Sequence, residues 1–314
     1  MNTDVSTRKY KENAANSDDL NMTQVQTASL SDWLDLTKPR LSSMSVLTAL
    51  FGYLAAPSAA DPLTFLSLLF GTALAAGGAA AYNQWWEREE DAKMERTTDR
   101  SIPSGKITPN DARILATLLS TAGIGILLVG TNLLCSLIIA LTIALYVMVY
   151  TPLKKITPLN TLVGAVPGAI PPLAGWVAAE NEFSLVGLLL FAILFLWQMP
   201  HFMAISWVHR EDYARGGFRM LSYYDPSGRR VAFHSLIYTL ILTGVAMFPV
   251  YLFNAGIVYW LPALALNGVL LYLAYNFWRK KERLPCAKLL FFATLVYLPL
   301  FLSFFVVGLR LYAV

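Results

Sequence analysis

Charged side chains are scarce in this chain of 314 residues, since Asp, Glu, Lys and Arg make up only 14% of it. A typical soluble domain has about 25%. Apolar residues (Ala, Val, Ile, Leu, Met, Phe, Trp, Tyr and Cys) account for 56%. A soluble fold of this composition has too little charge to cover so much apolar surface. The composition therefore excludes an ordinary cytosolic enzyme and a disordered protein, and it favours a protein whose solvent is the lipid bilayer.

Cysteine is also scarce, with Cys135 and Cys286 as the two examples. Two cysteines far apart in sequence exclude a disulfide framework and a cysteine metal cluster. The formal net charge is +4, which by itself could suggest nucleic acid as a partner. In a membrane protein the placement of Lys and Arg carries more information than their sum, so no nucleic-acid partner is predicted.

Apolar stretches long enough to cross a bilayer, which requires about 20 residues each, recur along the chain. We predict an all-α polytopic membrane protein with nine transmembrane helices. They are expected at 42–60, 65–83, 112–130, 133–151, 160–179, 185–206, 231–253, 257–278 and 288–308. Residues 1–30 are polar and lack apolar periodicity, which predicts a disordered tail before a membrane domain at 31–314. Residues 31–40 are expected to form a short interfacial helix.

The basic residues alternate with these spans. Of the 24 Lys and Arg residues, 23 fall in the N-terminal tail or in the even-numbered connections, and only Arg310 falls on the other side. Because cytoplasmic connections carry the excess of Lys and Arg, the pattern predicts a cytoplasmic N-terminus. It also places the two long polar connections, after the second and the sixth span, on the cytoplasmic face.

Oxygen-bearing side chains line up where the second span leaves the membrane. Asn83, Glu87 and Asp91 are four residues apart, and on a helix they would project within about 80° of one another. Such ligands suit Mg²⁺, which completes its shell with water and substrate phosphates. Arg96 and Arg100 are also four residues apart, and their planar guanidinium groups can form bidentate hydrogen bonds with a diphosphate or with carboxylates. The alternative is a solvated loop whose charges only set the topology.

The sixth span carries polar side chains where lipid would be a poor neighbour. Gln198 and His201 lie three residues apart on one face. For His201, a hydrogen bond between helices is the alternative to a functional role. The span ends in a carboxylate-bearing turn that includes Asp212, and a basic turn from Tyr150 to Lys155 follows the fourth span.

Together these segments resemble the UbiA superfamily of intramembrane prenyltransferases, and within it the haem O synthase branch. The resemblance covers nearly the whole chain after residue 32. It rests on TKPR (37–40), NxxxExxxD (83–91), MERTxxR (94–100) followed by PSG, YTPLKK (150–155), PPLAGW (171–176), WQMPHF (197–202) and REDYARGG (210–217). One departure is that Gly216 stands where superfamily members often place a second acid, four residues after Asp212. The number of bound Mg²⁺ ions therefore stays open.

The resemblance implies transfer of the farnesyl group of farnesyl diphosphate to a vinyl side chain of haem B, giving haem O and diphosphate, in the bacterial cytoplasmic (inner) membrane. It implies that Mg²⁺ is held by Asn83, Glu87, Asp91 and Asp212. It further implies a set of substrate-binding residues: Arg96, Arg100, Tyr150, Lys154, Gln198, His201 and Arg210. Arg100 could serve the diphosphate or the haem propionates, and His201 could ligate the haem iron. A haem A synthase or a terminal oxidase is the partner that the family suggests.

Two alternatives belong to other classes. The first is another UbiA-type prenyltransferase, with a quinone precursor or chlorophyllide as acceptor. Such an enzyme would share Asn83, Glu87 and Asp91 but not the strings WQMPHF, EDYARGG and MERTxxR. The second is a transporter or channel, which multi-pass topology and intramembrane polar residues would suit. Against the second, the charged residues gather at one face instead of lining both halves of the membrane.

Overall fold

The computed structural model describes residues 28–312, and between them it contains helices and no β-strand. The long helices are listed here in chain order: α3 (Pro39–Ala55), α4 (Pro62–Trp86), α6 (Pro109–Gly130), the continuous run of α7 (Leu133–Ala144), η1 (Leu145–Tyr150) and α8 (Thr151–Leu153), α9 (Asn160–Glu180), α10 (Leu185–Val208), α12 (Arg229–Ala246) continued by α13 (Phe248–Leu252), α14 (Ile257–Arg279) and α15 (Arg283–Tyr312). Short helices connect them: α2 (Leu30–Leu36), α5 (Arg88–Asp91), α11 (Arg210–Arg215) and η2 (Leu221–Tyr224).

Among these residues, eight helices are long and apolar enough to span a membrane. The prediction of an all-α polytopic membrane protein is confirmed, whereas the count of nine is not. The first predicted span, 42–60, accounts for the difference. It corresponds to α3, which has 17 residues and ends at Ala55 instead of residue 60. Ala56 is extended and precedes Pro57, whose ring disfavours helical geometry in the residue before it.

The N-terminal predictions are met in part. The interfacial helix expected at 31–40 is α2, which Ser29 caps by accepting from the Asp32 amide. It ends at Leu36, so that α3 begins at Pro39, three residues before the predicted start of the first span. Most of the predicted tail, residues 1–27, lies outside the described residues, and the domain boundary at residue 30 stays a prediction.

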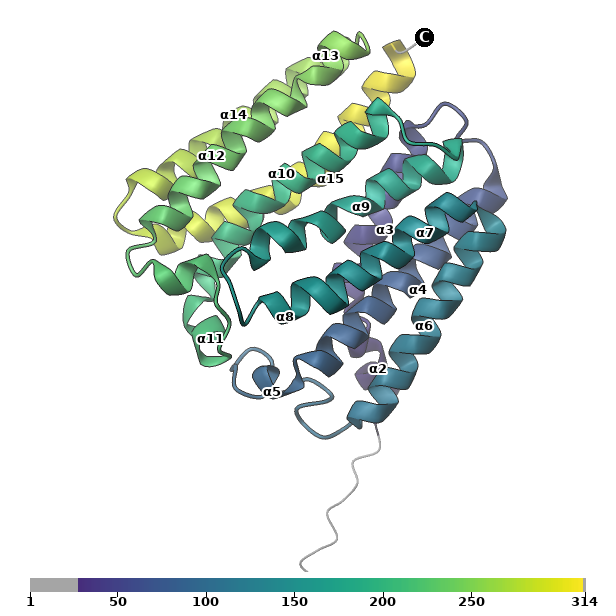
Figure 1. Cartoon of the computed structure of the whole chain (residues 1–314). Helices are drawn as coiled ribbons and strands as arrows, with labels where there is room; N and C mark the ends of the chain where they lie inside the picture. The colour runs from purple at the N-terminus through teal and green to yellow at the C-terminus, as the bar shows by residue number, and fades with distance from the viewer. Residues whose placement is uncertain (1–27, 313–314) are drawn as a thin grey trace, which may run out of the picture.

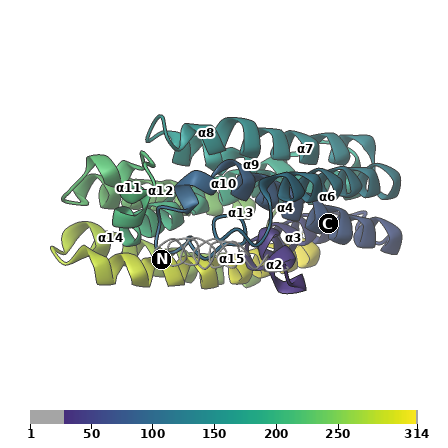
Figure 2. The same cartoon turned by 90° about the horizontal axis from the view of Figure 1, so that it is seen from below.

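The long helices form one bundle (Figure 1). In one group α3 packs on α9 and α4 packs on α6, while in the other α10 packs on α12 and α14 packs on α15. Contacts of α9 with α10 and of α3 with α15 join the two groups, and contacts between α10 and α15 hold the second group together. Figure 2 shows α7 and α8 on one side of the bundle and α14 and α15 on the other. The connections with functional interest, α2, α5 and α11, lie at the same end (Figure 1).

Small residues let α3 and α9 approach closely. A Cβ atom on Gly175 would lie 1.8 Å from the Ala49 carbonyl oxygen, and one on Gly52 would lie 1.9 Å from that of Pro172. Close approach through small residues is a common way to pack membrane helices. The two helices therefore form one tight wall of the cavity described below.

Candidate active site

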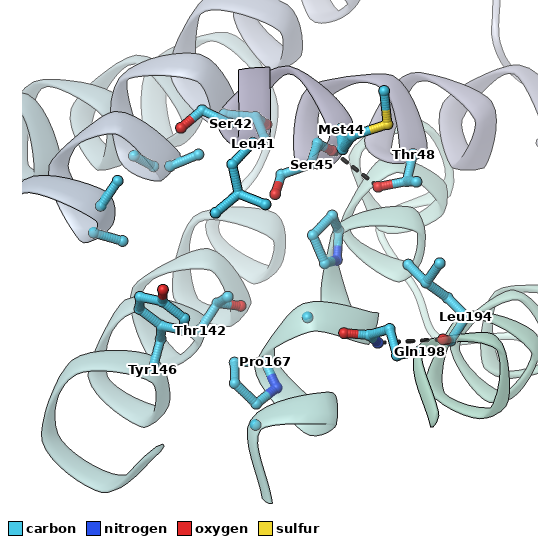
Figure 3. Close-up of a pocket in the computed structure, with 18 of the residues that line it drawn as sticks. Leu41, Ser42, Met44, Ser45, Thr48, Thr142, Tyr146, Pro167, Leu194 and Gln198 are labelled. Atoms are coloured by element: carbon cyan, nitrogen blue, oxygen red, sulfur yellow. Dashed lines mark hydrogen bonds between the residues drawn. The ribbon is translucent and has the colours of Figure 1, made fainter. Parts of the chain in front are cut away.

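A cavity lies inside the bundle, between α3, α4, α7, η1, α9, α10 and α15. Its wall is mostly apolar, with a few hydroxyl and amide groups. Figure 3 shows Leu41 and Thr48 from α3, Tyr146 from η1, and Gln198 from α10 around this space. The predicted residues Tyr150, Gln198 and His201 all line it. Such a lining can hold an apolar group and orient it through a small number of polar contacts.

A π-helical turn, η1, shapes the wall that carries the tyrosines. Tyr146 and Tyr150 both face the cavity, with ring centroids 5.4 Å apart. The Thr151 hydroxyl donates to the Tyr146 carbonyl, five residues back, at 2.9 Å. Gly164 leaves room for the second ring, because a Cβ there would lie 2.4 Å from Tyr150 Cε2. Single π-turns inside α-helices are frequent at functional sites.

Asn83, Glu87 and Asp91, which we call the oxygen stripe, lie at the α5 end of the bundle. The three residues do not lie in one helix, because α4 ends at Trp86 and α5 begins at Arg88. Main-chain bonds from Glu87 N to Asn83 O (3.0 Å) and from Asp91 N to Glu87 O (2.8 Å) nevertheless keep the spacing of a helix. All three side chains are buried, with exposed fractions of 1% for Asn83, 4% for Glu87 and 1% for Asp91.

Each member of the stripe contacts one basic side chain. Lys38 Nζ donates to Asn83 Oδ1 at 2.7 Å. Lys154 Nζ lies 2.7 Å from Glu87 Oε1, and Arg100 Nη1 lies 2.6 Å from Asp91 Oδ2. Of these bases, Arg100 and Lys154 were predicted site residues, whereas Lys38 was part of the TKPR string without an assigned role.

Lys38 reaches the site through an unusual backbone conformation. It has φ +46° and ψ +62° at the turn between α2 and α3, in the left-handed region that non-glycine residues rarely adopt. Gln84 of α4 holds this turn in place by donating to the carbonyls of Asp35 and Leu36 at 3.0 Å. Strained backbone of this kind persists where the surroundings fix it, and it concentrates at functional sites.

Burial and charge shift the pKa values of these groups. Burial lowers the pKa of Lys38 to about 7, and the charge of Arg100 adds to this effect. Burial also opposes the charged form of Lys154, but the Glu87 carboxylate together with Tyr150 and Tyr146 outweighs this effect and raises the pKa of the lysine. Burial raises the pKa of Asp91 against the opposing effect of Arg100. The α5 end of the bundle therefore concentrates buried groups of both signs, and among these three the charged form is favoured only for Lys154.

The donor set has the chemistry of a hard-cation site. Between residues 28 and 312, no three His, Cys, Asp or Glu side chains gather closely enough to form a ready-made metal cluster. However, Asp91 Oδ1 is buried and makes no hydrogen bond there, which is costly for a carboxylate oxygen. That oxygen, the Asn83 amide and the Glu87 carboxylate are ligands of the type that Mg²⁺ takes. The residues present therefore fit this ion.

Asp212 meets the same connection from the side of α11. Its Oδ1 accepts from the Glu95 amide at 3.1 Å and from Arg215 Nη2 at 2.7 Å, and Oδ2 lies 4.0 Å from Arg96 Nε. Burial opposes its ionisation, but the bonds from Arg215 and Glu95 hold the pKa of Asp212 below its usual range. The structure thus brings Asp212 to the segment that follows Asp91 and places Arg96 beside it, while the role of Asp212 as a second carboxylate ligand stays a prediction.

The remaining predicted residues differ in their surroundings. Gln198 Nε2 donates to the Ala165 and Leu194 carbonyls, and the latter bond is drawn in Figure 3. His201 Nδ1 lies 2.8 Å from Thr294 Oγ1 in α15, so the hydrogen bond between helices that was considered for His201 is present. Arg210 contacts the exposed Glu211 at 2.8 Å, and its described contacts do not connect it to the oxygen stripe.

Comparison with known proteins identifies the family. The model of the UbiA prenyltransferase family matches residues 45–296. The chain belongs to this family. It is therefore a prenyltransferase, and the transporter or channel alternative is wrong.

Relatives within the UbiA family support the predicted branch. A protein of Opitutus terrae named protoheme IX farnesyltransferase is 43% identical, over 94% of this chain and 100% of its own length. One of Solibacter usitatus with the same name is 40% identical, over 86% of this chain and 95% of its own. These relatives belong to the branch that the sequence strings indicate, and the predicted resemblance is confirmed.

Solved structures of UbiA-type proteins share the fold. A structure described as digeranylgeranylglyceryl phosphate synthase in membranes has a TM-score of 0.75 at 18% identity and covers 90% of this chain and 99% of its own. A UbiA homologue of Archaeoglobus fulgidus, bound to GPP and Mg²⁺, has a TM-score of 0.62 at 11% identity, with 89% and 99% covered. At these identities the likeness establishes the arrangement of helices.

Proposed function

We propose that this enzyme transfers the farnesyl group of farnesyl diphosphate to a vinyl side chain of haem B, giving haem O and diphosphate. The observation that carries the proposal is the pairing of an apolar cavity with a charged end. Lys154 Nζ lies 4.6 Å from the centre of the Tyr150 ring, which lines the cavity, and it also contacts Glu87. An isoprenoid diphosphate likewise consists of an apolar chain, which suits the cavity, and a charged diphosphate, which suits the charged end. The acceptor is the substrate in the name of the relatives.

We propose that Mg²⁺ is held by Asn83, Glu87, Asp91 and Asp212. The support is the buried Asp91 Oδ1 without a hydrogen bond, together with the Mg²⁺ and prenyl diphosphate named for the Archaeoglobus fulgidus homologue. A bound Mg²⁺ would offset the negative charge that develops on the leaving oxygen. If these oxygens held the ion, Lys38, Lys154 and Arg100, which contact them in this structure, would be available to bind the phosphate oxygens.

The basic residues and the tyrosines of the site have different roles in the reaction. Arg96, Arg100 and Lys154 supply fixed positive charge to the diphosphate, and such preorganised charge is commonly the largest catalytic contribution. Lys38 can donate a hydrogen bond to a phosphate oxygen, whereas the contacts of Arg210 with Glu211 and Trp207 leave its predicted role without support. As the bond from carbon to oxygen breaks, positive charge forms on the allylic carbon. The faces of Tyr146 and Tyr150 can stabilise this charge.

The apolar wall of the cavity keeps water from the allylic carbon until the vinyl group attacks. The new bond joins the allylic carbon to the vinyl terminus and leaves a cation on the adjacent carbon. Water then adds there and loses one proton, which gives the hydroxyethylfarnesyl group of haem O. Gln198 and His201 line the same cavity, where they can contact the acceptor.

Loss of the gene tests this function in the cell. Cells without the protein should retain haem B but lack haem O and haem A, because both require the farnesyl group. The measurement is chromatography and mass spectrometry of extracted haems, with a plasmid copy of the gene as the control that restores them. Unchanged haem O in cells that have no other farnesyltransferase of this type would contradict the proposal.

We further propose that the protein lies in the bacterial cytoplasmic membrane with the end that carries α2, α5 and α11 in the cytoplasm. The distribution of 23 of 24 basic residues supports it. Reporter fusions after residues 61, 131, 181 and 255 should therefore report the outer side. A cytoplasmic signal at any of these positions would contradict the orientation. The haem A synthase or terminal oxidase suggested as a recipient of haem O stays a prediction.

A further inference from the structure

The imidazole of His201 is held in a fixed plane on the cavity wall. Its ring centroid lies 5.1 Å from that of Trp197, at an interplanar angle of 21°. It also lies 5.0 Å from Phe291 of α15 and 5.6 Å from Phe202. Aromatic neighbours at these distances restrict rotation of the ring, so the direction of its two nitrogens is determined by the packing of α10 against α15.

The hydrogen bonds of Thr294 determine which nitrogen carries the proton. Thr294 is fully buried, and its Oγ1 lies 2.6 Å from the Phe291 carbonyl oxygen and 2.8 Å from His201 Nδ1. A hydroxyl has one hydrogen, and a carbonyl oxygen can only accept. The Thr294 hydrogen therefore points to Phe291, because otherwise two oxygen lone pairs would face each other at 2.6 Å. Consequently Nδ1 of His201 donates to Thr294 Oγ1.

The other nitrogen is left with its lone pair. In a neutral imidazole with hydrogen on Nδ1, Nε2 is an acceptor, and within residues 28–312 no hydrogen bond to His201 Nε2 is present. Trp197 Nε1 donates to the Thr294 main-chain oxygen at 3.0 Å, so Thr294 is fixed to α10 at two points. The pair of Thr294 and His201 thus presents a neutral imidazole of defined tautomer at the cavity.

We propose that Thr294 is a positioning residue that fixes this tautomer, and that Nε2 of His201 ligates the iron of the haem acceptor. The proposal rests on the proposed function, because it requires haem as the substrate. Neutral imidazole is a common metal ligand, and a ligating histidine usually donates its other N–H to a second group that orients the ring. Thr294 is that second group.

The surroundings favour a ligand over a proton acceptor. A histidine that takes up a proton is typically stabilised by a carboxylate on its other nitrogen. Here the partner is a neutral hydroxyl, and the described ring contacts of His201 are aromatic. Iron ligation would also orient the reaction. Figure 3 shows Gln198, which precedes His201 by three residues in α10, across the cavity from Tyr146, so a porphyrin held at α10 would face the tyrosine wall.

The vibration of the bond between iron and imidazole provides a direct test. Ferrous haem B is bound to the purified full-length protein without farnesyl diphosphate, so that no turnover occurs, and resonance Raman spectra are recorded. The wild type should show an iron–histidine stretching band. His201→Ala should lose it, and added imidazole should restore ligation. A retained band in His201→Ala would overturn the ligand assignment.

Thr294 is tested in the same spectra. Thr294→Val removes the acceptor of the Nδ1 hydrogen, so the iron–histidine band should shift to lower frequency and haem should bind about tenfold more weakly, as for other groups that orient metal ligands. Thr294→Ser keeps the hydroxyl and should behave as the wild type. An unshifted band in Thr294→Val would overturn the positioning role, and the thermal midpoint of each variant checks that it folds.

A matched histidine provides the control. His234 Nδ1 lies 2.8 Å from the Arg230 carbonyl oxygen, so its N–H is also hydrogen-bonded, but His234 does not line the cavity. His234→Ala should leave the band unchanged, and its loss there would overturn the assignment to His201. A wild type that binds haem and makes haem O without an iron–histidine band would remove this inference alone, whereas a wild type that neither binds nor farnesylates haem would remove the proposed function as well.

Discussion

Asp91→Asn should lower the rate of haem O formation by about a thousandfold, which is the scale of loss expected when charge stabilisation of a leaving group is removed. The change keeps the volume of the side chain but removes its charge. Asp91 is buried and lies 2.6 Å from Arg100, so the variant also leaves Arg100 without its partner. The measurement is the initial rate at saturating farnesyl diphosphate and haem B, over a titration of Mg²⁺.

Glu89→Gln provides the matched control for this prediction. Glu89 lies in the same short helix, but its side chain is 72% exposed and contacts only Arg88 among the described ion pairs. An exposed ion pair contributes little to stability, so this variant should remain close to the wild type. If Asp91→Asn kept normal turnover at limiting Mg²⁺, Asp91 would not be a ligand.

Asp212→Asn should weaken the apparent affinities for Mg²⁺ and farnesyl diphosphate, with a loss of kcat/KM of about a hundredfold. A diphosphate carried by Mg²⁺ needs ligands from more than one wall to be held in one orientation. Asp212 comes from the α11 wall and already contacts the segment after Asp91. Gly216 cannot replace a missing carboxylate, so no acid lies four residues further along to take over this role.

Two outcomes distinguish the roles open to Asp212. A ligand should show weaker Mg²⁺ binding, measured for example through the spin signal of Mn²⁺ as a substitute, whereas a residue that only holds Arg96 and Glu95 should raise the KM for farnesyl diphosphate at unchanged metal affinity. Glu211→Gln is the control, because its side chain is 76% exposed. Equal effects at 211 and 212 would show that the wrong carboxylate was assigned.

The sequence predicted the spans well because hydropathy over about 20 residues governs them. The fourth span, expected at 133–151, is observed at 133–153, and the sixth, expected at 185–206, is observed as α10 at Leu185–Val208. The break between α4 and α5 within the oxygen stripe has a local cause. Arg88 Nη1 donates to the Trp85 carbonyl at 2.9 Å and so helps to satisfy the end of α4, which is a capping role that hydropathy does not reveal.

The missed parts of the site depend on tertiary structure. Lys38 could have been noticed as a lysine beside a proline at the start of a span, but its left-handed backbone and its contact with Asn83 arise from the docking of α2 on α4. Thr294 is one of several hydroxyl-bearing residues in the apolar helix α15, 93 residues from His201, and nothing in its sequence neighbourhood marks it. Tyr146 faces the cavity with Tyr150 where the chain forms a π-turn.

The most direct test of the account is product formation by the purified protein in lipid vesicles. Farnesyl diphosphate is supplied with haem B or with 4-hydroxybenzoate, in the presence of Mg²⁺ or of a chelator, and products are identified by mass spectrometry alongside released diphosphate. The account predicts haem O and an equal amount of diphosphate only with haem B and Mg²⁺ together. Farnesylated 4-hydroxybenzoate with unchanged haem B, or haem O formed at the same rate in the chelator, would contradict it.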